Sequence, residues 1–194
     1  MKNILTVLLL IFSLLSLAQK TNRTHTFRVV DWTIIIPEDF TIMDSASDAA
    51  LNQKGVKDME DANGIKVDAS ATRTLISASK PPHNYFNSTI TPYDPVKDGN
   101  YDSTCAAVAD VVYRTFTTKI PAAKLDTFSR ETTIDNLTFH RFEVKATVNS
   151  QVIFNLVVLT KYYRGFDFGI TYLYQDEKSR DEIERMLAAS KFKK

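Results

Sequence analysis

Few side chains in this sequence could take part in chemistry, and they lie far apart along the chain. Cys105 is the only cysteine, and the histidines are His25, His83 and His140. Cys105 could be a catalytic thiol, but no histidine lies near it in sequence and alanine and valine follow it, which favours a small buried residue on a helix. His140 falls on the apolar side of a strand pattern, which favours a core histidine over a general base. The sequence therefore shows no catalytic constellation.

The segment 92–102 is the stretch that most resembles a binding site, because it mixes polar and aromatic residues between a strand pattern and a helix pattern. Long loops on compact domains are usually either functional or disordered. We therefore predict an irregular, exposed binding loop here, with Asp102 or Ser103 capping the next helix. The candidate binding residues are Tyr93, Asp94, Asp98, Asn100 and Tyr101.

The same segment contains part of a calcium-loop pattern. Asp98, Asn100 and Asp102 have the one-three-five spacing of calcium ligands, but Ser103 stands where glycine should follow and Ala109 where the bidentate glutamate should be. We expect no catalytic, cofactor or metal site, with calcium at this loop as the alternative.

The N-terminus is typical of an exported protein. An apolar run extends from Ile4 to Leu17, and Ser16 and Ala18 are the small residues that a signal peptidase reads before Gln19. The run is shorter than the roughly 20 apolar residues that span a membrane. The expected organisation is a cleaved signal peptide at 1–18, a flexible lead-in at 19–25 and a single domain at 26–194. We therefore expect a periplasmic or secreted protein with no transmembrane segment after cleavage.

The charge balance argues against nucleic acid as a partner. The chain has 24 Lys and Arg against 23 Asp and Glu, and the predicted leader carries only Lys2 among charged residues. Nucleic acids and anionic membranes both favour a concentrated basic surface, which this sequence lacks. A single cysteine also excludes an intramolecular disulfide. The sequence does not indicate an oligomeric state.

Strand patterns follow one another near the C-terminus. In 137–147 apolar and polar residues alternate, which predicts a half-buried strand with Arg141 and Glu143 in solvent. The run 151–161 is apolar on both faces, which predicts a central strand covered on both sides. In 166–174 alternation returns, with aromatic residues on one face. The short turns between these runs contain residues that tolerate a left-handed backbone, so we expect an antiparallel meander.

The N-terminal half has weaker patterns. A helix is expected over 45–63, where the apolar stripe is thin and Gly64 supplies a stop signal. Near its end, Asp58, Glu60 and Asp61 lack the order of a calcium loop, which favours a solvated helix end. Short strands are expected within 26–36, 65–79 and 85–91.

Two more helix patterns are clearer. One carries Cys105 and Phe116 on its apolar face and ends before Pro121. The last helix is expected to begin with a capping box formed by Ser179 and Glu182. Its buried stripe is predicted as Ile183, Met186, Leu187 and Ser190.

The order of these elements resembles the PsbP-like family. The resemblance rests on the strand ending at 34–40, the turn at 164–165, the strand at 168–172 and the closing segment 183–192, and it covers most of 27–192. It implies an α+β protein, an α/β/α sandwich with a central, mostly antiparallel sheet and a C-terminal helix. Family members include extrinsic photosystem subunits, a Ran-binding import factor and exported bacterial proteins, none with a motif that can be placed here. A helix-grip fold is the alternative.

Three functions follow from these observations. The first is an exported, non-enzymatic accessory module that binds an envelope protein, as the resemblance implies. The second is a carrier of a small apolar ligand in a pocket between sheet and helices. The third is a hydrolase built on the segment from His83 to Asp102, which has an acid and a histidine but no convincing nucleophile. The aromatic residues that suggest the carrier are Phe166, Phe168, Tyr172 and Tyr174.

Overall fold

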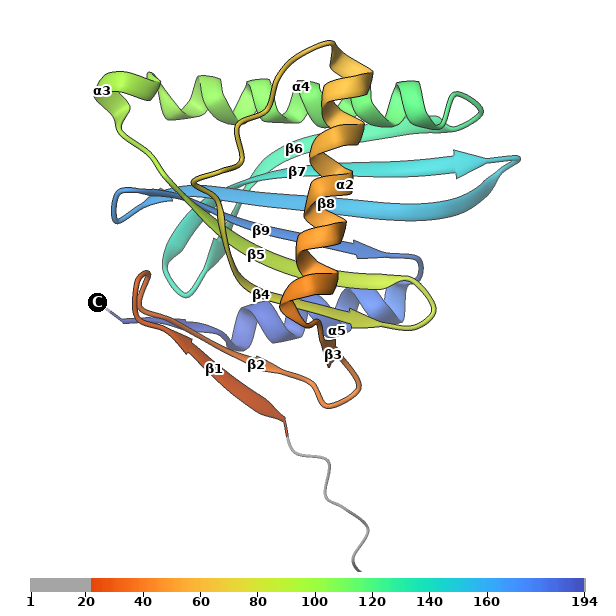
Figure 1. Ribbon diagram of the computed structural model, residues 1–194. Coiled ribbons are helices and arrows are strands. Elements are labelled where there is room, and N and C mark those ends of the chain that lie inside the picture. The colour runs from red at the N-terminus through yellow and green to blue at the C-terminus, as the bar shows by residue number, and fades with distance from the viewer. Residues whose placement is uncertain (1–21, 194) are drawn as a thin grey trace, which may run out of the picture.

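The computed structural model describes residues 22–193, so the predicted signal peptide at 1–18 lies outside the described residues (Figure 1). The helices are α2 (Ser45–Asn63), α3 (Pro95–Asp98), α4 (Tyr101–Lys119) and α5 (Glu177–Ala189). The strands are β1 (Arg23–Phe27), β2 (Trp32–Ile36), β3 (Thr41–Ile42), β4 (Arg73–Lys80), β5 (Asn84–Pro92), β6 (Lys124–Ile134), β7 (Leu137–Val148), β8 (Gln151–Tyr163), β9 (Phe166–Tyr174) and β10 (Lys191–Phe192).

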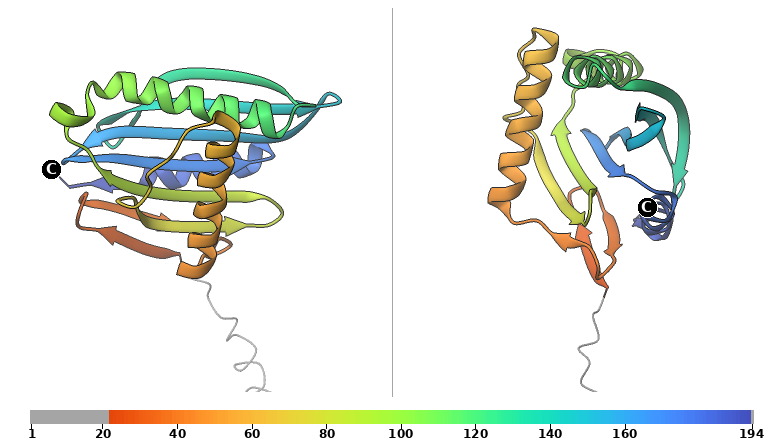
Figure 2. Two further views of the ribbon diagram at one scale, coloured as in Figure 1. Left: turned by 45° about the horizontal axis from the view of Figure 1, so that its top comes forward. Right: turned by 90° about the vertical axis from the view of Figure 1, so that its right-hand side faces the viewer.

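A seven-stranded antiparallel sheet forms the middle layer, with strand order β3-β4-β5-β9-β8-β7-β6. Helices α2 and α4 lie on one face, and α5 with the small sheet β1-β2-β10 lies on the other (Figures 1 and 2). The predicted α/β/α sandwich with a mostly antiparallel sheet and a C-terminal helix is therefore confirmed. The predicted flexible lead-in at 19–25 is wrong for residues 23–25, because these residues belong to β1, which pairs with β2.

The meander is built by two-residue turns that adopt a left-handed backbone, as predicted. Asp135 and Asn136 have φ values of 43° and 70°, and Arg164 and Gly165 have 54° and 80°. Such turns match the right-handed twist of paired strands. The middle of β8 is buried on both faces, as its apolar pattern predicts, although its N-terminal end at Val152 is exposed.

The main core lies between the large sheet, the small sheet and α5. Trp32, Phe168 and Phe192 form its aromatic centre, with ring centroids 5.4 to 6.1 Å apart. A smaller core lies under α4, where Phe116 packs on Phe154. Phe168, Tyr172 and Tyr174 belong to the main core and Phe166 packs against it, so the aromatic face that suggested a ligand carrier is a packing surface.

Arg141 and Glu143 do not face solvent, which corrects the prediction for β7. Helix α5 covers this part of the sheet, and Arg141 is only 4% exposed. Its Nε donates to Glu143 Oε1 at 2.7 Å and its Nη1 to Glu184 Oε1 at 2.8 Å, while Tyr172 Oη donates to the same Glu184 oxygen at 2.5 Å. The charges of Arg141, Glu143 and Glu184 pair with one another. This part of β7 therefore carries a buried polar network where the pattern predicted a solvent-exposed face.

Helix α5 begins earlier than its predicted capping box. Asp176 is the N-cap, and its carboxylate accepts the backbone N–H of Ser179 at 2.8 Å. Glu182 pairs with Lys80 instead of closing a capping box. An acidic N-cap satisfies the same exposed amides and also complements the helix dipole. The buried stripe Ile183, Met186, Leu187 is confirmed, and Ser190 is the buried C-cap.

Helix α2 has the predicted limits, and Gly64 ends it with a φ of 64°. No residue of α2 is buried, in keeping with its thin apolar stripe. Polar contacts anchor it, including Asn63 Nδ2 to Thr115 Oγ1 of α4 at 2.9 Å. Within residues 22–193, no helix combines the length and apolar character needed to cross a membrane.

Candidate functional site

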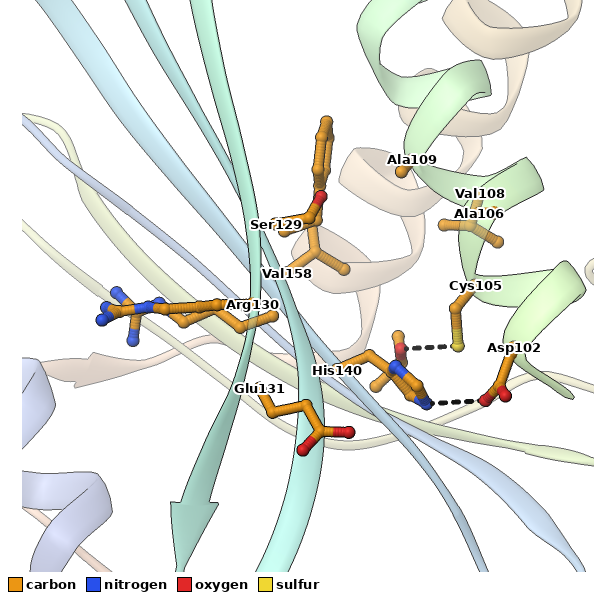
Figure 3. Close-up of a pocket in the computed structure, with 13 residues that line it drawn as sticks. Asp102, Cys105, Ala106, Val108, Ala109, Ser129, Arg130, Glu131, His140 and Val158 are labelled. Atoms are coloured by element: carbon orange, nitrogen blue, oxygen red, sulfur yellow. Dashed lines mark hydrogen bonds and ion pairs between the residues drawn. The ribbon is translucent and has the colours of Figure 1, made fainter.

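A pocket of about 340 Å³ opens between the first half of α4 and strands β6, β7 and β8 (Figure 3). Its walls are largely apolar, formed by Val108 and Ala109 of α4 together with Phe142 and Val158 of the sheet. The polar residues that line it are Asp102, Cys105, Ser129, Arg130, Glu131, His140, Arg141 and Thr160. A volume of this size is at the small end of ligand pockets.

The geometry of α4 and the sheet brings these polar residues together. Asn100 caps α4 by accepting the N–H of Ser103 at 3.0 Å, so Asp102 and Cys105 lie three residues apart in the first turns, on one face. Opposite them, His140 of β7 is paired directly with Thr160 of β8. The acid, the thiol, the imidazole and the hydroxyl therefore meet at one end of the pocket.

The bonds within the site do not form a nucleophile and base pair. His140 Nε2 lies 3.2 Å from Asp102 Oδ1, while Cys105 Sγ lies 3.3 Å from Thr160 Oγ1 (Figure 3). Burial is the main cause that raises the pKa of the Cys105 thiol, with the charge of Asp167 adding to it. The thiol is therefore protonated near neutral pH, whereas a nucleophilic cysteine needs a lowered pKa.

Two tyrosines pack together at this end of the pocket, one of them next to His140. The rings of Tyr93 and Tyr101 are 5.1 Å apart, and the ring of Tyr101 is 5.9 Å from that of His140. Tyr101 Oη donates to Asp167 Oδ1 at 2.6 Å. Burial raises the pKa of Asp167 above its usual value, and the Tyr101 hydrogen bond partly offsets this effect. Tyr101 therefore holds the half-buried carboxyl of Asp167 in place beside the pocket.

The predicted binding loop is more ordered than its composition indicates. Tyr93 is only 9% exposed, and its hydroxyl donates to the Gly99 carbonyl at 3.0 Å. Asp94 caps the short helix α3 by accepting the N–H of Val96 at 3.0 Å, and Asp98 accepts the N–H of Asp94 at 2.7 Å. Val96, on α3, is 93% exposed. The expectation of exposed loop tyrosines is therefore wrong, while binding by this segment stays a prediction.

Helix α4 is capped by Asn100, not by Asp102 or Ser103 as predicted. The Asn100 side chain accepts the Ser103 N–H in this cap, and the Asp102 carboxylate contacts His140. A calcium ion at Asp98, Asn100 and Asp102 would have to displace both interactions. Among residues 22–193, no three His, Cys, Asp or Glu side chains cluster closely enough to hold a metal ion. The absence of a metal site stays the prediction, with calcium at this segment as the untested alternative.

The structure separates the two residues on which the hydrolase hypothesis rests. His83 lines a groove of about 1000 Å³ between α2 and strands β4, β5 and β9, whereas Asp102 lines the pocket under α4. Asp102 meets His140 instead. Sequence reasoning missed this pair because it joins a helix to a strand that follows much later. The one available signal was the apolar alternation that places His140 on the same face as Phe142.

The comparisons with known proteins identify the fold. No protein-family model matches the chain, and no curated protein matches it by sequence. The structure is similar to the solution structure of cyanobacterial PsbP (CyanoP) from Synechocystis sp. PCC 6803, with a TM-score of 0.53 and 10% identity over 92% of this chain and 96% of that chain. The likeness establishes a PsbP-like fold.

Two crystal structures show weaker similarity. One, from Bacteroides thetaiotaomicron VPI-5482, has a TM-score of 0.47 and 9% identity over 89% of this chain and 49% of that chain. The other is LpqN of Mycobacterium tuberculosis, with a TM-score of 0.42 and 7% identity over 90% of this chain and 86% of that chain.

Proposed function

We propose that the protein is an exported, non-enzymatic accessory module that binds a protein of the cell envelope through the pocket under α4. The observation that carries the proposal is the pairing inside the pocket. The imidazole is held by Asp102 and the thiol by Thr160, so the polar groups are set to bind and not to react. A PsbP-like fold supports an accessory role by analogy.

The chemistry of the pocket limits what the partner would present. Its floor is apolar, and the carboxylates of Asp102 and Glu131 lie near His140 at its rim (Figure 3). Arg130 also borders the pocket, but its side chain points away from α4 (Figure 3). The site therefore suits a Lys or Arg side chain, whose aliphatic stem packs on an apolar floor while its charged head meets carboxylates.

The proposal can be tested by filling the pocket. Ala106 and Ala107 are both exposed on α4, but only Ala106 lines the pocket. In affinity capture from an envelope extract, Ala106→Phe should lose the partner that the parent protein retains, while Ala107→Phe should keep it. Thermal unfolding checks that both variants are folded. Equal capture by the parent and Ala106→Phe would contradict the proposal.

A second candidate function is the transport of a small ligand in the groove beside α2. The groove is about 1000 Å³ and is lined by apolar residues of α2, including Leu51 and Met59, and by Leu173 of the sheet. Gentle mass spectrometry of the protein purified from its host tests this candidate. A bound small molecule that is lost on Met59→Trp would support it, and a mass equal to the bare chain would argue against it.

A further inference from the structure

Strand β6 forms an open edge of the large sheet. It pairs with β7 on one side, and among residues 22–193 no strand pairs with its other side. Residues 126–131 are all exposed, so both faces and the outer edge of this stretch are accessible. In the right-hand view of Figure 2, β6 runs along the outer margin of the molecule, away from α2. A long open edge is a template for a further strand unless the sequence protects it.

The turn that joins β6 to β7 fixes which backbone groups face outward. Asp135 and Asn136 form a two-residue turn that makes Ile134 and Leu137 a hydrogen-bonded pair. The register continues without a bulge, so hydrogen-bonded pairs recur at every second residue and include Phe128 with Glu143. Thr127 and Ser129 are in the alternate positions, and their backbone N–H and C=O groups therefore point to the free edge.

The side chains along this edge are self-complementary. Asp126 and Arg130 flank Phe128 at equal spacing on the side of the sheet that faces α5. In a two-fold antiparallel pairing centred on Phe128, Asp126 lies opposite Arg130 of the second copy and Arg130 opposite its Asp126. The two Phe128 rings then meet in a non-hydrogen-bonded pair, where side chains are closest. Thr127 and Ser129 supply the intermolecular backbone bonds.

The isolated chain leaves these groups weakly used. Phe128 is 57% exposed, which is high for a large aromatic residue. Asp126 pairs with the exposed Lys124 at 2.8 Å, and Arg130 pairs with Glu143 at 3.2 Å from a half-exposed position and lies over the exposed Phe128 ring, 5.8 Å from its centroid. Exposed pairs of this kind contribute little to stability, so both are available to a partner.

We propose that β6 is a dimerisation edge, at which two copies of this chain join their seven-stranded sheets into one continuous antiparallel sheet. Opposite charges and aromatic residues directly across two strands are favourable pairs. A second copy fits better than an unrelated strand because the charge pattern of residues 126–130 is its own complement. Ser129 and Arg130 also border the pocket under α4, but the Arg130 side chain points away from α4 (Figure 3).

The proposal is tested by reversing the charge of Asp126 or Arg130 and measuring dimerisation of the purified protein by sedimentation velocity over a range of concentrations. Asp126→Arg alone and Arg130→Asp alone each place two like charges opposite one another in the pair. Each should weaken dimerisation at least about tenfold, because both flanking attractions become repulsions. The double variant should recover the dimer.

A mixture of the two single variants gives the sharpest result. Asp126→Arg offers two cations and Arg130→Asp offers two anions, so each should dimerise weakly alone, while the mixture should form a heterodimer at concentrations where neither variant dimerises. Asp110→Arg, the same charge change at an exposed site on α4, should dimerise like the parent. A parent that is monomeric up to about millimolar concentration, or single variants that dimerise as well as the parent, would overturn the proposal.

Discussion

The Asp102, Cys105 and His140 side chains show how residues of catalytic type can be arranged for another purpose. In a thiol enzyme the imidazole would contact the sulfur and lower its pKa. Here the imidazole contacts a carboxylate, the sulfur contacts a hydroxyl, and burial raises the thiol pKa. The same residue types therefore form a polar rim above an apolar floor.

Tyr101→Phe tests whether the Tyr101 hydroxyl stabilises the half-buried carboxyl of Asp167. Because burial raises the pKa of Asp167 in the folded protein, its contribution to stability is full below the unfolded pKa of about 3.9 and is lost as pH rises through the folded pKa. Tyr101 limits that loss by donating to the carboxylate. Removing the hydroxyl should cost about 1.5–3 kcal/mol at pH 7 and less at pH 4, where more of the carboxyl is protonated.

Urea unfolding at the two pH values measures this difference. Tyr162→Phe is the matched control, because its ring lies in the same cluster, 6.0 Å from that of Tyr101. It should cost little at either pH. An equal cost of Tyr101→Phe at pH 7 and pH 4 would mean that the Asp167 carboxylate does not depend on this bond.

At the level of elements, α5 is held on the sheet by charge as well as by apolar contact. Arg141 joins Glu143 of its own strand to Glu184 of the helix. Sequence alternation placed Arg141 in solvent because a strand pattern cannot show which parts of its polar face a later helix will cover. The capping error at Ser179 has a different cause, because Asp and Ser are about equally good N-cap residues and the sequence does not distinguish Ser179 from Asp176, three residues earlier.

Arg141→Leu tests this contact between α5 and the sheet. It leaves two partly buried carboxylates without their shared cation and should lower the free energy of unfolding by about 3 kcal/mol. Arg114→Leu removes a comparable pair with Asp110, 2.8 Å apart but exposed, and should cost less than about 1 kcal/mol. Chemical denaturation compares the two, and similar costs would show that the buried network does not stabilise the docking of α5.

At the scale of the whole molecule, the sandwich has a layer on each face of the sheet. Adjacent residues of β8 point to opposite faces, so substitutions at these residues test the two layers separately. Leu156 belongs to the core under α4, while Val157 belongs to the core beneath α5. Leu156→Asp and Val157→Asp should each abolish soluble folded protein, because an unpaired buried carboxylate costs several kcal/mol. Lys145→Asp, on the exposed part of β7, should fold. Normal folding of either β8 variant would contradict a layer on that face.

Much of this architecture could be predicted from the sequence, because alternation, turn residues and helix stops are local signals. The apolar run of β8, the left-handed turns and Gly64 at the end of α2 are examples. The site could not be predicted in the same way. Its parts come from α4, β7 and β8, and only the packing of helix on sheet brings Cys105 near His140. The tyrosines were likewise misplaced because burial depends on neighbours that a loop pattern does not reveal.

The most direct test of the account uses Cys105 as a natural reporter. It is the only cysteine of the chain and it lines the pocket. Because burial raises the pKa of this thiol, labelling with a neutral maleimide is followed at mildly alkaline pH, where the free protein should react slowly but measurably, and labelling should slow further in proportion to the fraction of protein bound to the captured envelope partner. In Ala107→Phe the same protection should appear. Labelling of Cys105 at an unchanged rate while the partner is bound would contradict the claim that the pocket under α4 is the binding site.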